Sequence, residues 1–506
     1  MGEAVVKTYS EYMKEISGQE LYKALLGYGL FPEKLPPIFS SEEFYNYCIL
    51  NKPSFAGKAR QYVYYESMRN INIPRQMGIP VPMAYQKLCS FVSDIWESEL
   101  IPHFERKTSN QDFKVSRIHV RKMKNSSAVF EMSYKNWKTD DSPEESILMN
   151  MKYVVRADIS KCFPSIYTHS LAWALVGKDK AKRTKGDRKY FYNKLDHLVQ
   201  INKDLETHGL LIGPHISNIL AEIILCSVDY ELVSKGFKYI RNIDDYTAYV
   251  ETEKDAEMFL VALQEELRKY DLSINHKKTK IEKLPLAMTE QWTRRIVPIS
   301  ILTSYKMVDY KNCRAYLDSA IEIAENEQWN SAVLNWAIKV LSSFQLTNNA
   351  KQYEKHMVFH LAIMYPYLVP LLEDYVFSKC DVTPDEVKEL SCALYNNGIK
   401  SKKYEQASYA LYYSIKYGFC LDVKIDDIIK SGDCILLSVA LMYFRKKRDG
   451  NSEKELVKYA KTLEQSPAEG DFDQNWIFVY EALSQEQLHD EWKDMKKSGV
   501  SFFVEP

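Results

Sequence analysis

Residues 239 to 250 read Tyr239-Ile240-Arg241-Asn242-Ile243-Asp244-Asp245-Tyr246-Thr247-Ala248-Tyr249-Val250, a run of apolar and aromatic side chains that two adjacent acids interrupt. Such a run indicates β-structure on both sides of the acids, so we expect a β-hairpin with Asp244 and Asp245 at its turn. Two carboxylates this close repel each other unless cations neutralise them, and Mg²⁺ is a usual solution because it prefers oxygen ligands. Asp-Asp is also a common dipeptide in solvated turns, so a third carboxylate is needed to decide between a metal site and a turn.

The composition is that of a globular chain with two or three domains and large cores. The chain has 506 residues, of which 46% are hydrophobic and 27% are charged, and its formal charge is −1. A site for a polyanion must therefore come from local clustering of basic residues. The nine cysteines form no CxxC pair, which favours a reducing compartment. We find no signal peptide and no uninterrupted apolar run of membrane-spanning length, so we expect a cytoplasmic protein without a membrane partner.

The third carboxylate stands at the end of another expected strand, over residues 153–159. This stretch is Tyr153-Val154-Val155-Arg156-Ala157-Asp158-Ile159, and it continues into Ser160-Lys161-Cys162-Phe163-Pro164-Ser165-Ile166. An acid at the end of a strand can reach a site at the edge of the sheet. Asp158 is therefore the partner that the double aspartate needs for a metal site.

Two further segments flank the double aspartate. Residues 209–218 form a glycine-containing turn, Gly209-Leu210-Leu211-Ile212-Gly213-Pro214-His215-Ile216-Ser217-Asn218, which opens an apolar helix expected over 219–232. An amphipathic helix is expected over 255–270, and it is followed by Asn275-His276-Lys277-Lys278-Thr279. Between Asp158 and the glycine turn lies a basic stretch, in which a loose surface loop and contact with a nucleic-acid backbone are equally good interpretations; it contains Lys178, Lys180, Lys182, Arg183, Lys185, Arg188 and Lys189.

The two ends of the chain differ in character. Residues 1 to about 110 are expected to be helical with proline-marked breaks, including a helix from Tyr85 to Phe104, and a locally basic hairpin with Arg117 and Arg121 is expected over 117–134. Beyond about residue 300 the pattern predicts continuous helix, without a strict repeat. Three caps are expected there: a helix start at Thr383, a helix end at Gly398, and a second start at Ser452 with Glu455.

The order of these segments resembles the palm domain of reverse transcriptases. Residues 158–166 are similar to the family's motif A, Gly209 through Ile223 to motif B, Asn242-Ile243-Asp244-Asp245 to the YxDD box of motif C, and Asn275 through Thr279 to the NxxKT of motif D. The resemblance implies an α+β fold: the fingers and palm of a right-hand polymerase, followed by an all-α, helical-repeat-like domain that replaces the thumb. We expect residues 1–150 to be the N-terminal region and fingers, 151–300 the palm, and 301–506 the helical domain.

The resemblance also implies a role for each matching residue. Asp158, Asp244 and Asp245 would be catalytic and would hold two Mg²⁺ ions about 4 Å apart, with Mn²⁺ as an alternative. The nucleotide would be contacted by Ile159, Phe163, Lys278, Arg117 and Arg121. Phe163 stands at the aromatic position that excludes a 2′-hydroxyl, unless it is an ordinary core residue. Lys278 stands near the leaving phosphate, unless it is a solvated strand end. No motif match supports the two arginines.

Two departures from the family pattern bear on templating. Asn242 stands where the family has the YxDD tyrosine, and Ile212 stands where motif B has a glutamine beside the template and nascent pair. Both changes weaken the case for ordinary templated copying. Moreover, the stretches 30–37 and 165–175 resemble bacterial abortive-infection reverse transcriptases of the phage-defence type, which join a polymerase to a helical domain.

This closer resemblance implies an antiphage DNA polymerase that adds deoxynucleotides from dNTPs without a template and primes on a protein hydroxyl. Its expected partners are dNTPs, a single-stranded DNA product attached to a tyrosine, and further copies of itself in a homo-oligomer. Candidate primers in the N-terminal region are Tyr9, Tyr12, Tyr45 and Tyr47, and many tyrosines of the C-terminal region are equally open. Two alternatives stay open: a templated reverse transcriptase working with a dedicated RNA, and a non-catalytic protein whose helical domain binds partners.

Overall fold

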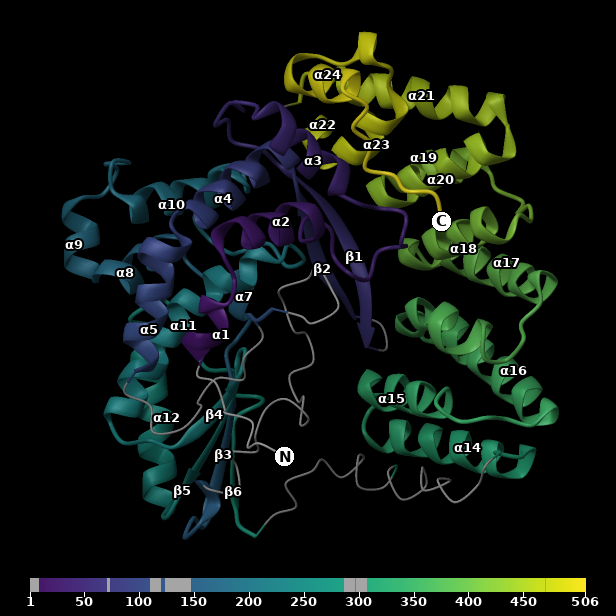
Figure 1. Cartoon of the computed structure of the whole chain (residues 1–506). Coiled ribbons are helices and arrows are strands. Elements are labelled where there is room, and N and C mark those ends of the chain that lie inside the picture. Colours follow the sequence, from purple (N-terminus) through teal and green to yellow (C-terminus); the bar gives the residue numbers. More distant parts are fainter. Residues whose placement is uncertain are drawn as a thin grey trace. The chain divides into compact units, whose positions relative to one another are not determined.

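The computed structural model describes residues 9–70, 73–109, 120–122, 147–285, 296, 307–468 and 470–506 (Figure 1). They form two compact units. The first contains the described residues within Met1–Pro32, Ser40–Tyr62 and Gly78–Leu286, and the second those within Glu33–Phe39, Val63–Met77 and Ala287–Pro506. The expected division at residues 150 and 300 stays a prediction. The hairpin expected over 117–134 lies outside the described residues except for 120–122.

The centre of the first unit is a four-stranded antiparallel sheet in the order β4-β5-β3-β6. The strands are β3 (Tyr153–Asp158), β4 (Tyr239–Asn242), β5 (Asp245–Val250) and β6 (Lys280–Lys283). Val155 lies opposite Ala248 and Ala157 opposite Tyr246, and all four side chains are buried. Because side chains alternate along a strand, Asp158 belongs to the other face of the sheet, together with the exposed Arg156.

Helices surround this sheet. Helix α12 packs on β3 and β5, and α11 packs on α12 (Figure 1). Both confirm the sequence expectations within a few residues, because their apolar spacing has a helical period. The expected helix from Tyr85 to Phe104 is found as α4, the π-helical turn η1 and α5. The helices of this unit are α1 (Tyr9–Lys14), α2 (Gly18–Tyr28), α3 (Glu42–Asn51), α4 (Pro82–Asp94), η1 (Trp96–Leu100), α5 (Ile101–Thr108), α7 (Cys162–Ser165), α8 (His169–Val176), α9 (Lys178–Arg183), α10 (Phe191–Ile201), α11 (Ile216–Ser234) and α12 (Glu253–Arg268).

The second unit is built of stacked helices, in which α17 packs on α18, α18 on α20, and α20 on α23. Within the described residues, no helix of either unit is both long and apolar enough to cross a bilayer. The helices of this unit are α14 (Tyr310–Asn326), α15 (Ser331–Leu341), α16 (Asn348–Met364), η3 (Pro366–Leu371), η4 (Glu373–Phe377), α17 (Pro384–Lys400), α18 (Tyr404–Tyr417), α19 (Ile425–Ser431), α20 (Cys434–Lys447), α21 (Gly450–Glu464), α22 (Asp471–Gln474), α23 (Trp476–Ala482), η5 (Gln485–Gln487) and α24 (Asp490–Lys497).

One of the three expected helix caps in this unit is confirmed and two are wrong. Thr383 and Glu386 form a capping box at the start of α17. Helix α17 does not end at Gly398 but continues to Lys400, and Gly398 lies where a Cβ would come within 2.8 Å of the Ala407 nitrogen of α18. The glycine therefore allows close helix packing. Helix α21 begins at Gly450, two residues before Ser452, because Asp449 accepts the hydrogen bonds of its first amides.

A two-stranded sheet, β1 (Tyr62–Asn70) and β2 (Ile73–Pro80), corrects the expectation of helix throughout the first 110 residues. In β1, Val63 and Tyr65 are buried while Tyr64 and Glu66 are exposed, which is the two-residue period of a strand. Most of this sheet belongs to the second unit. The buried carboxylate of Glu405 in α18 accepts hydrogen bonds from Ser67 Oγ at 2.9 Å and from the Met68 amide at 2.8 Å.

Glu405 makes the stability of the second unit depend on pH. Burial, only partly offset by the bonds from Met68 and Ser67, raises the pKa of Glu405 from 4.5 to about 7. The folded state therefore binds the proton more tightly, so the contribution is full below pH 4.5 and is lost as the pH rises through 7. At about 1.4 kcal/mol per pKa unit, we expect Glu405→Gln to remove about 3 kcal/mol of this pH dependence from the free energy of unfolding.

The measurement is urea unfolding between pH 4.5 and pH 8, followed by tryptophan fluorescence. Glu389→Gln, which changes an exposed carboxylate on α17, is the matched control and should leave the pH dependence unchanged. A Glu405→Gln protein with the wild-type pH dependence would contradict the assignment. Burial also raises the pKa of Asp433, to about 6. Both proteins should therefore keep a smaller dependence of the free energy of unfolding on pH.

Candidate active site

The double aspartate lies at a two-residue hairpin turn. Asn242 and Asp245 are paired across β4 and β5, so the turn consists of Ile243 and Asp244. The expectation that both acids occupy the turn is therefore wrong for Asp245, which is the first residue of β5. Ile243 has a φ of 55°, a left-handed conformation that is costly for a β-branched side chain. The guanidinium of Arg241 supports it by donating a hydrogen bond of 2.8 Å from Nη1 to the Ile243 carbonyl.

The third acid joins the other two through the register of the sheet. Asp158, the last residue of β3, lies directly opposite Asp245 of β5. The Ile159 amide then donates to the Asp244 carbonyl at 3.1 Å, which fixes the turn beside the end of β3. Residues that are far apart in the sequence are thus brought to one end of one sheet. The structure brings together all three carboxylates that the sequence predicts as metal ligands.

The electrostatics of this cluster favour a bound cation. Desolvation first, and then the charges of Asp244 and Asp158, raise the pKa of Asp245 to about 6. Lys278 works in the opposite direction because its ammonium lowers the pKa. A carboxylate whose pKa is raised by burial and by neighbouring acids gains most when a divalent ion neutralises it. The donor set, which consists of carboxylate oxygens from three residues, fits hard cations such as Mg²⁺.

The segment after α12 contacts Asp158 from the other side. Lys278 Nζ lies 2.6 Å from Asp158 Oδ2, and Asn275 Nδ2 donates to Asp158 Oδ1 at 3.1 Å. The Asn275 amide also donates to the Asp158 carbonyl at 2.7 Å. Asn275 was not among the predicted site residues, although it opens the NxxKT pattern. Its side chain orients the carboxylate, and Lys278 neutralises it.

The glycine turn packs against the segment that follows Asp158. The Gly209 amide donates to the Ile166 carbonyl, and the Leu210 amide donates to the Phe163 carbonyl, both at 2.8 Å. Gly209 has a φ of 85°, and a Cβ there would lie 2.9 Å from the Pro164 carbonyl oxygen. A glycine is therefore required at this position both by conformation and by space. The turn fixes the backbone of Phe163.

This arrangement agrees with the comparison of the sequence with known families. Residues 111–294 match the family model described as reverse transcriptase (RNA-dependent DNA polymerase). The chain contains a reverse transcriptase domain. The expectation of an α+β fold of the reverse-transcriptase type is thereby confirmed for this domain.

Comparisons with whole proteins give less information about the family than the domain match does. No curated protein matches the chain. Among solved structures, the apo telomerase from Candida tropicalis matches with a TM-score of 0.28 and 10% identity, over 83% of this chain and 73% of that one. A form of it truncated from the C-terminal domain matches with a TM-score of 0.24 and 13% identity, over 46% of this chain and 53% of that one. The chain thus spans about half the length of the truncated telomerase. TM-scores this low do not establish a shared fold.

The remaining predicted site residues of the reverse transcriptase domain have different surroundings. Phe163 lies in the short helix α7 and is half-buried. The Ile159 side chain is only 1% exposed and its backbone pairs with Ile274, so Ile159 packs behind the acids and offers a nucleotide no side-chain surface. Arg121 is buried, with its guanidinium 5.9 Å from the Tyr12 ring, and Arg117 lies outside the described residues. Triphosphate contacts by the two arginines stay predictions.

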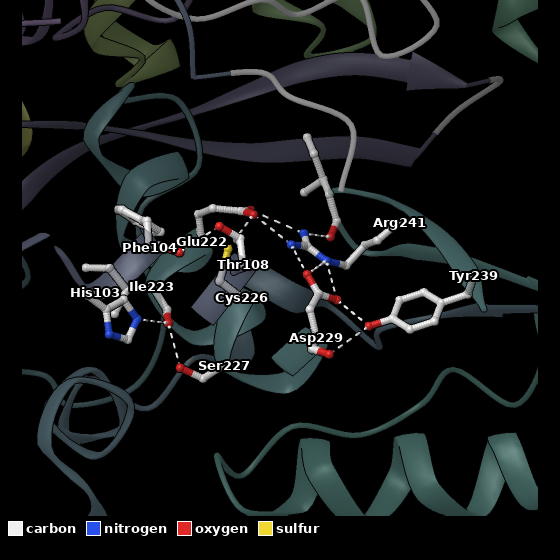
Figure 2. A network of polar contacts seen from close by, with 11 residues as sticks. His103, Phe104, Thr108, Glu222, Ile223, Cys226, Ser227, Asp229, Tyr239 and Arg241 are labelled. Atoms are coloured by element: carbon white, nitrogen blue, oxygen red, sulfur yellow. Dashed lines mark hydrogen bonds and ion pairs between the residues drawn. The ribbon is translucent and has the colours of Figure 1, made fainter. Parts of the chain in front are cut away.

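A buried ionic network that the sequence analysis missed holds the hairpin onto α11. Figure 2 shows Arg241 of β4 between Glu222 and Asp229. Its Nη2 lies 2.6 Å from an oxygen of each acid, and Tyr239 donates its hydroxyl proton to Asp229 at 2.8 Å. The charged side chains of all three ionic residues are at most 1% exposed. Because Asp229 and Glu222 outweigh the effect of burial, the pKa of Arg241 is raised above its already high value.

The same network excludes a metal at a second cluster of potential metal ligands, on α11. Glu222, Cys226 and Asp229 lie close enough together to hold an ion. The guanidinium of Arg241 already neutralises both acids, and Cys226 donates to Glu222 at 3.2 Å. This cluster therefore stabilises the hairpin.

Proposed function

We propose that this chain is a DNA polymerase of antiphage defence that adds deoxynucleotides without a template and primes on a protein hydroxyl. The observation that carries the proposal is the convergence of Asp158, Asp244 and Asp245 at one sheet end within a reverse transcriptase domain. The resemblance of residues 30–37 and 165–175 to abortive-infection enzymes supports the defence role, and so does the helical unit that follows. Homo-oligomerisation and a cytoplasmic location belong to the same proposal.

The three acids would act as ligands for two Mg²⁺ ions, which when bound supply charge neutralisation and activate the attacking hydroxyl. The chain's own residues prepare this site. Asn275 orients the Asp158 carboxylate, and the hairpin fixes Asp244. Lys278 has a side chain that is 63% exposed, so its ammonium is free to move from Asp158 to a phosphate oxygen of the nucleotide. This position supports the role of Lys278 beside the leaving pyrophosphate.

Two residues argue against templated copying. Ile212 offers an apolar side chain where the family's glutamine lies near the template pair, and its carbonyl is already bonded to the Gly78 amide at 2.9 Å. Asn242, in place of the family's tyrosine, lies half-buried opposite Asp245. Phe163, whose backbone the glycine turn fixes, is proposed to reject a 2′-hydroxyl and so to select deoxynucleotides.

Burial argues against one of the proposed priming tyrosines. Tyr9 is buried against Phe104, and burial raises the pKa of its phenol well above the usual value. A phenol that is both inaccessible and hard to ionise is a poor nucleophile. Tyr12, Tyr45 and Tyr47 are each partly exposed and stay candidates.

The test incubates the purified protein with Mg²⁺ and labelled dNTPs in the absence of any template. We expect labelled products that migrate with the protein and shift to free DNA only after protease digestion. Parallel reactions with labelled NTPs should give at most a few per cent of the signal if Phe163 excludes the 2′-hydroxyl. Product that runs as free DNA before protease would refute protein priming.

The alternatives give other results in the same assay. A templated enzyme would stay silent until a primer annealed to RNA is added, and its product would then copy that RNA. A non-catalytic helical-repeat protein would stay silent under both conditions. Either outcome would refute template-independent synthesis.

A further inference from the structure

The basic stretch after Asp158 lines a cavity of about 270 Å³ between α8, α9 and α10. Its lining includes three cations, Lys182, Lys185 and Arg188. It also includes the aromatic rings of Tyr167 and Trp173, whose centroids are 5.6 Å apart. A cavity of this size holds about one nucleotide, whose phosphate the cations can pair with and whose base the rings can contact.

The cations of this cavity are available to a ligand. Within the described part of the chain, Lys182, Lys185 and Arg188 take part in no ion pair. The loop that carries two of them is held in place, because Asn193 Nδ2 donates to the Thr184 carbonyl at 2.6 Å and to the Asp187 carbonyl at 3.0 Å. A fixed loop with unneutralised charges is what a phosphate requires, since little ordering remains when it binds.

The acid in the cavity, Asp196, is already hydrogen-bonded and forms no ion pair with Lys182, Lys185 or Arg188. Asp196 accepts a hydrogen bond from His169 Nδ1 and another, of 2.7 Å, from Gln200 Nε2. The His169 ring in turn contacts Tyr167 edge to face, with the centroids 4.7 Å apart. These bonds fix the ring positions before any ligand arrives. Rigid aromatic surfaces beside cations are the usual platform for single-stranded nucleic acid.

The basic residues continue beyond the cavity. Lys180 and Lys189 are exposed on the same short segment, outside the cavity's lining, and Lys178 places its ammonium 3.9 Å from the centre of the Trp173 ring. A free nucleotide in the cavity would not contact these charges, whereas the neighbouring phosphates of a strand would form ion pairs with them. The favoured ligand is therefore a strand with one nucleotide in the cavity.

We propose that the cavity between α8, α9 and α10 is a second nucleic-acid site, which binds one nucleotide of a single strand by stacking its base on Trp173, with the Tyr167 ring at the edge of the base, and pairing its phosphate with Lys182, Lys185 and Arg188. The site is separate from the three acids and does not depend on polymerisation. This second site can therefore be tested independently of the function proposed above.

The test measures binding of a fluorescent single-stranded dT20 by polarisation, using the full chain with Asp244→Asn so that no synthesis occurs. We expect Lys185→Gln/Arg188→Gln to weaken binding at least tenfold, and Trp173→Leu to weaken it about tenfold through lost stacking. The matched control, Lys180→Gln/Lys189→Gln, removes the same charge outside the cavity and should weaken binding less than threefold. Circular dichroism verifies that each variant is folded.

Three results would overturn the proposal. Equal losses in the two double variants would indicate a diffuse basic surface. Unchanged binding in folded Trp173→Leu would exclude base stacking on Trp173. Displacement of dT20 by dTMP at equal phosphate concentration would assign the cavity to free nucleotides instead of a strand.

Discussion

Asp244→Asn is expected to reduce nucleotide addition by the purified protein at least a thousandfold. The amide keeps the size of the side chain and is well accepted in turns, so the hairpin should fold. It removes one negative charge and one metal-binding oxygen from the three-acid cluster. Metal neutralisation of the reacting phosphates contributes several kcal/mol, and about 4 kcal/mol corresponds to three powers of ten in rate. The measurement is the initial rate of dNTP incorporation at saturating Mg²⁺.

Asp271→Asn provides the matched control for Asp244→Asn. Asp271 is an exposed acid in a left-handed turn conformation, with a φ of 61°, that asparagine also accepts. This variant should keep its rate within twofold of the wild type. Incorporation by Asp244→Asn within tenfold of wild type would mean that catalysis takes place elsewhere.

The parts of this site that the sequence predicts are those encoded locally. Each acid follows an apolar run, and Gly209 begins a turn. Patterns of a few residues were therefore enough to predict the strands that carry the acids and the glycine turn. The register that sets Asp158 opposite Asp245 is a long-range property of the sheet. Neither stretch alone predicts which residues of the two strands lie opposite each other. The match of four motifs in order predicted that the acids lie together.

The failures of sequence reasoning have tertiary causes. Glu405 has its partners on a strand more than three hundred residues earlier. Gly398 is explained by the approach of α18, which no local pattern of α17 reveals. By contrast, the Thr383 cap was predictable because both of its partners lie within one helical turn. Arg241, within an apolar run, gave no sign that α11 carries its two counter-charges.

Arg241→Met is expected to destabilise the catalytic hairpin by about 3–5 kcal/mol. The methionine fills a similar volume, but Glu222 and Asp229 then remain buried without a counter-charge, and this is the large cost of breaking such a network. The Ile243 carbonyl also loses its hydrogen bond, so the strained turn should relax. Amide hydrogen exchange of residues 239–250 should accelerate at least a hundredfold, since 1.4 kcal/mol corresponds to a factor of ten.

Arg156→Met is the matched control because Arg156 lies in the same sheet but forms an exposed ion pair with Glu282 at 2.9 Å. An exposed pair contributes less than about 1 kcal/mol, so exchange of the hairpin should change less than fivefold. Adding Glu222→Gln and Asp229→Asn to Arg241→Met removes the stranded charges and should restore most of the protection. If the triple variant were as unprotected as the single one, the hydrogen bond to Ile243 and not charge compensation would hold the turn. Protection without activity in the triple variant would show that the network also fixes Asp244 in its catalytic position.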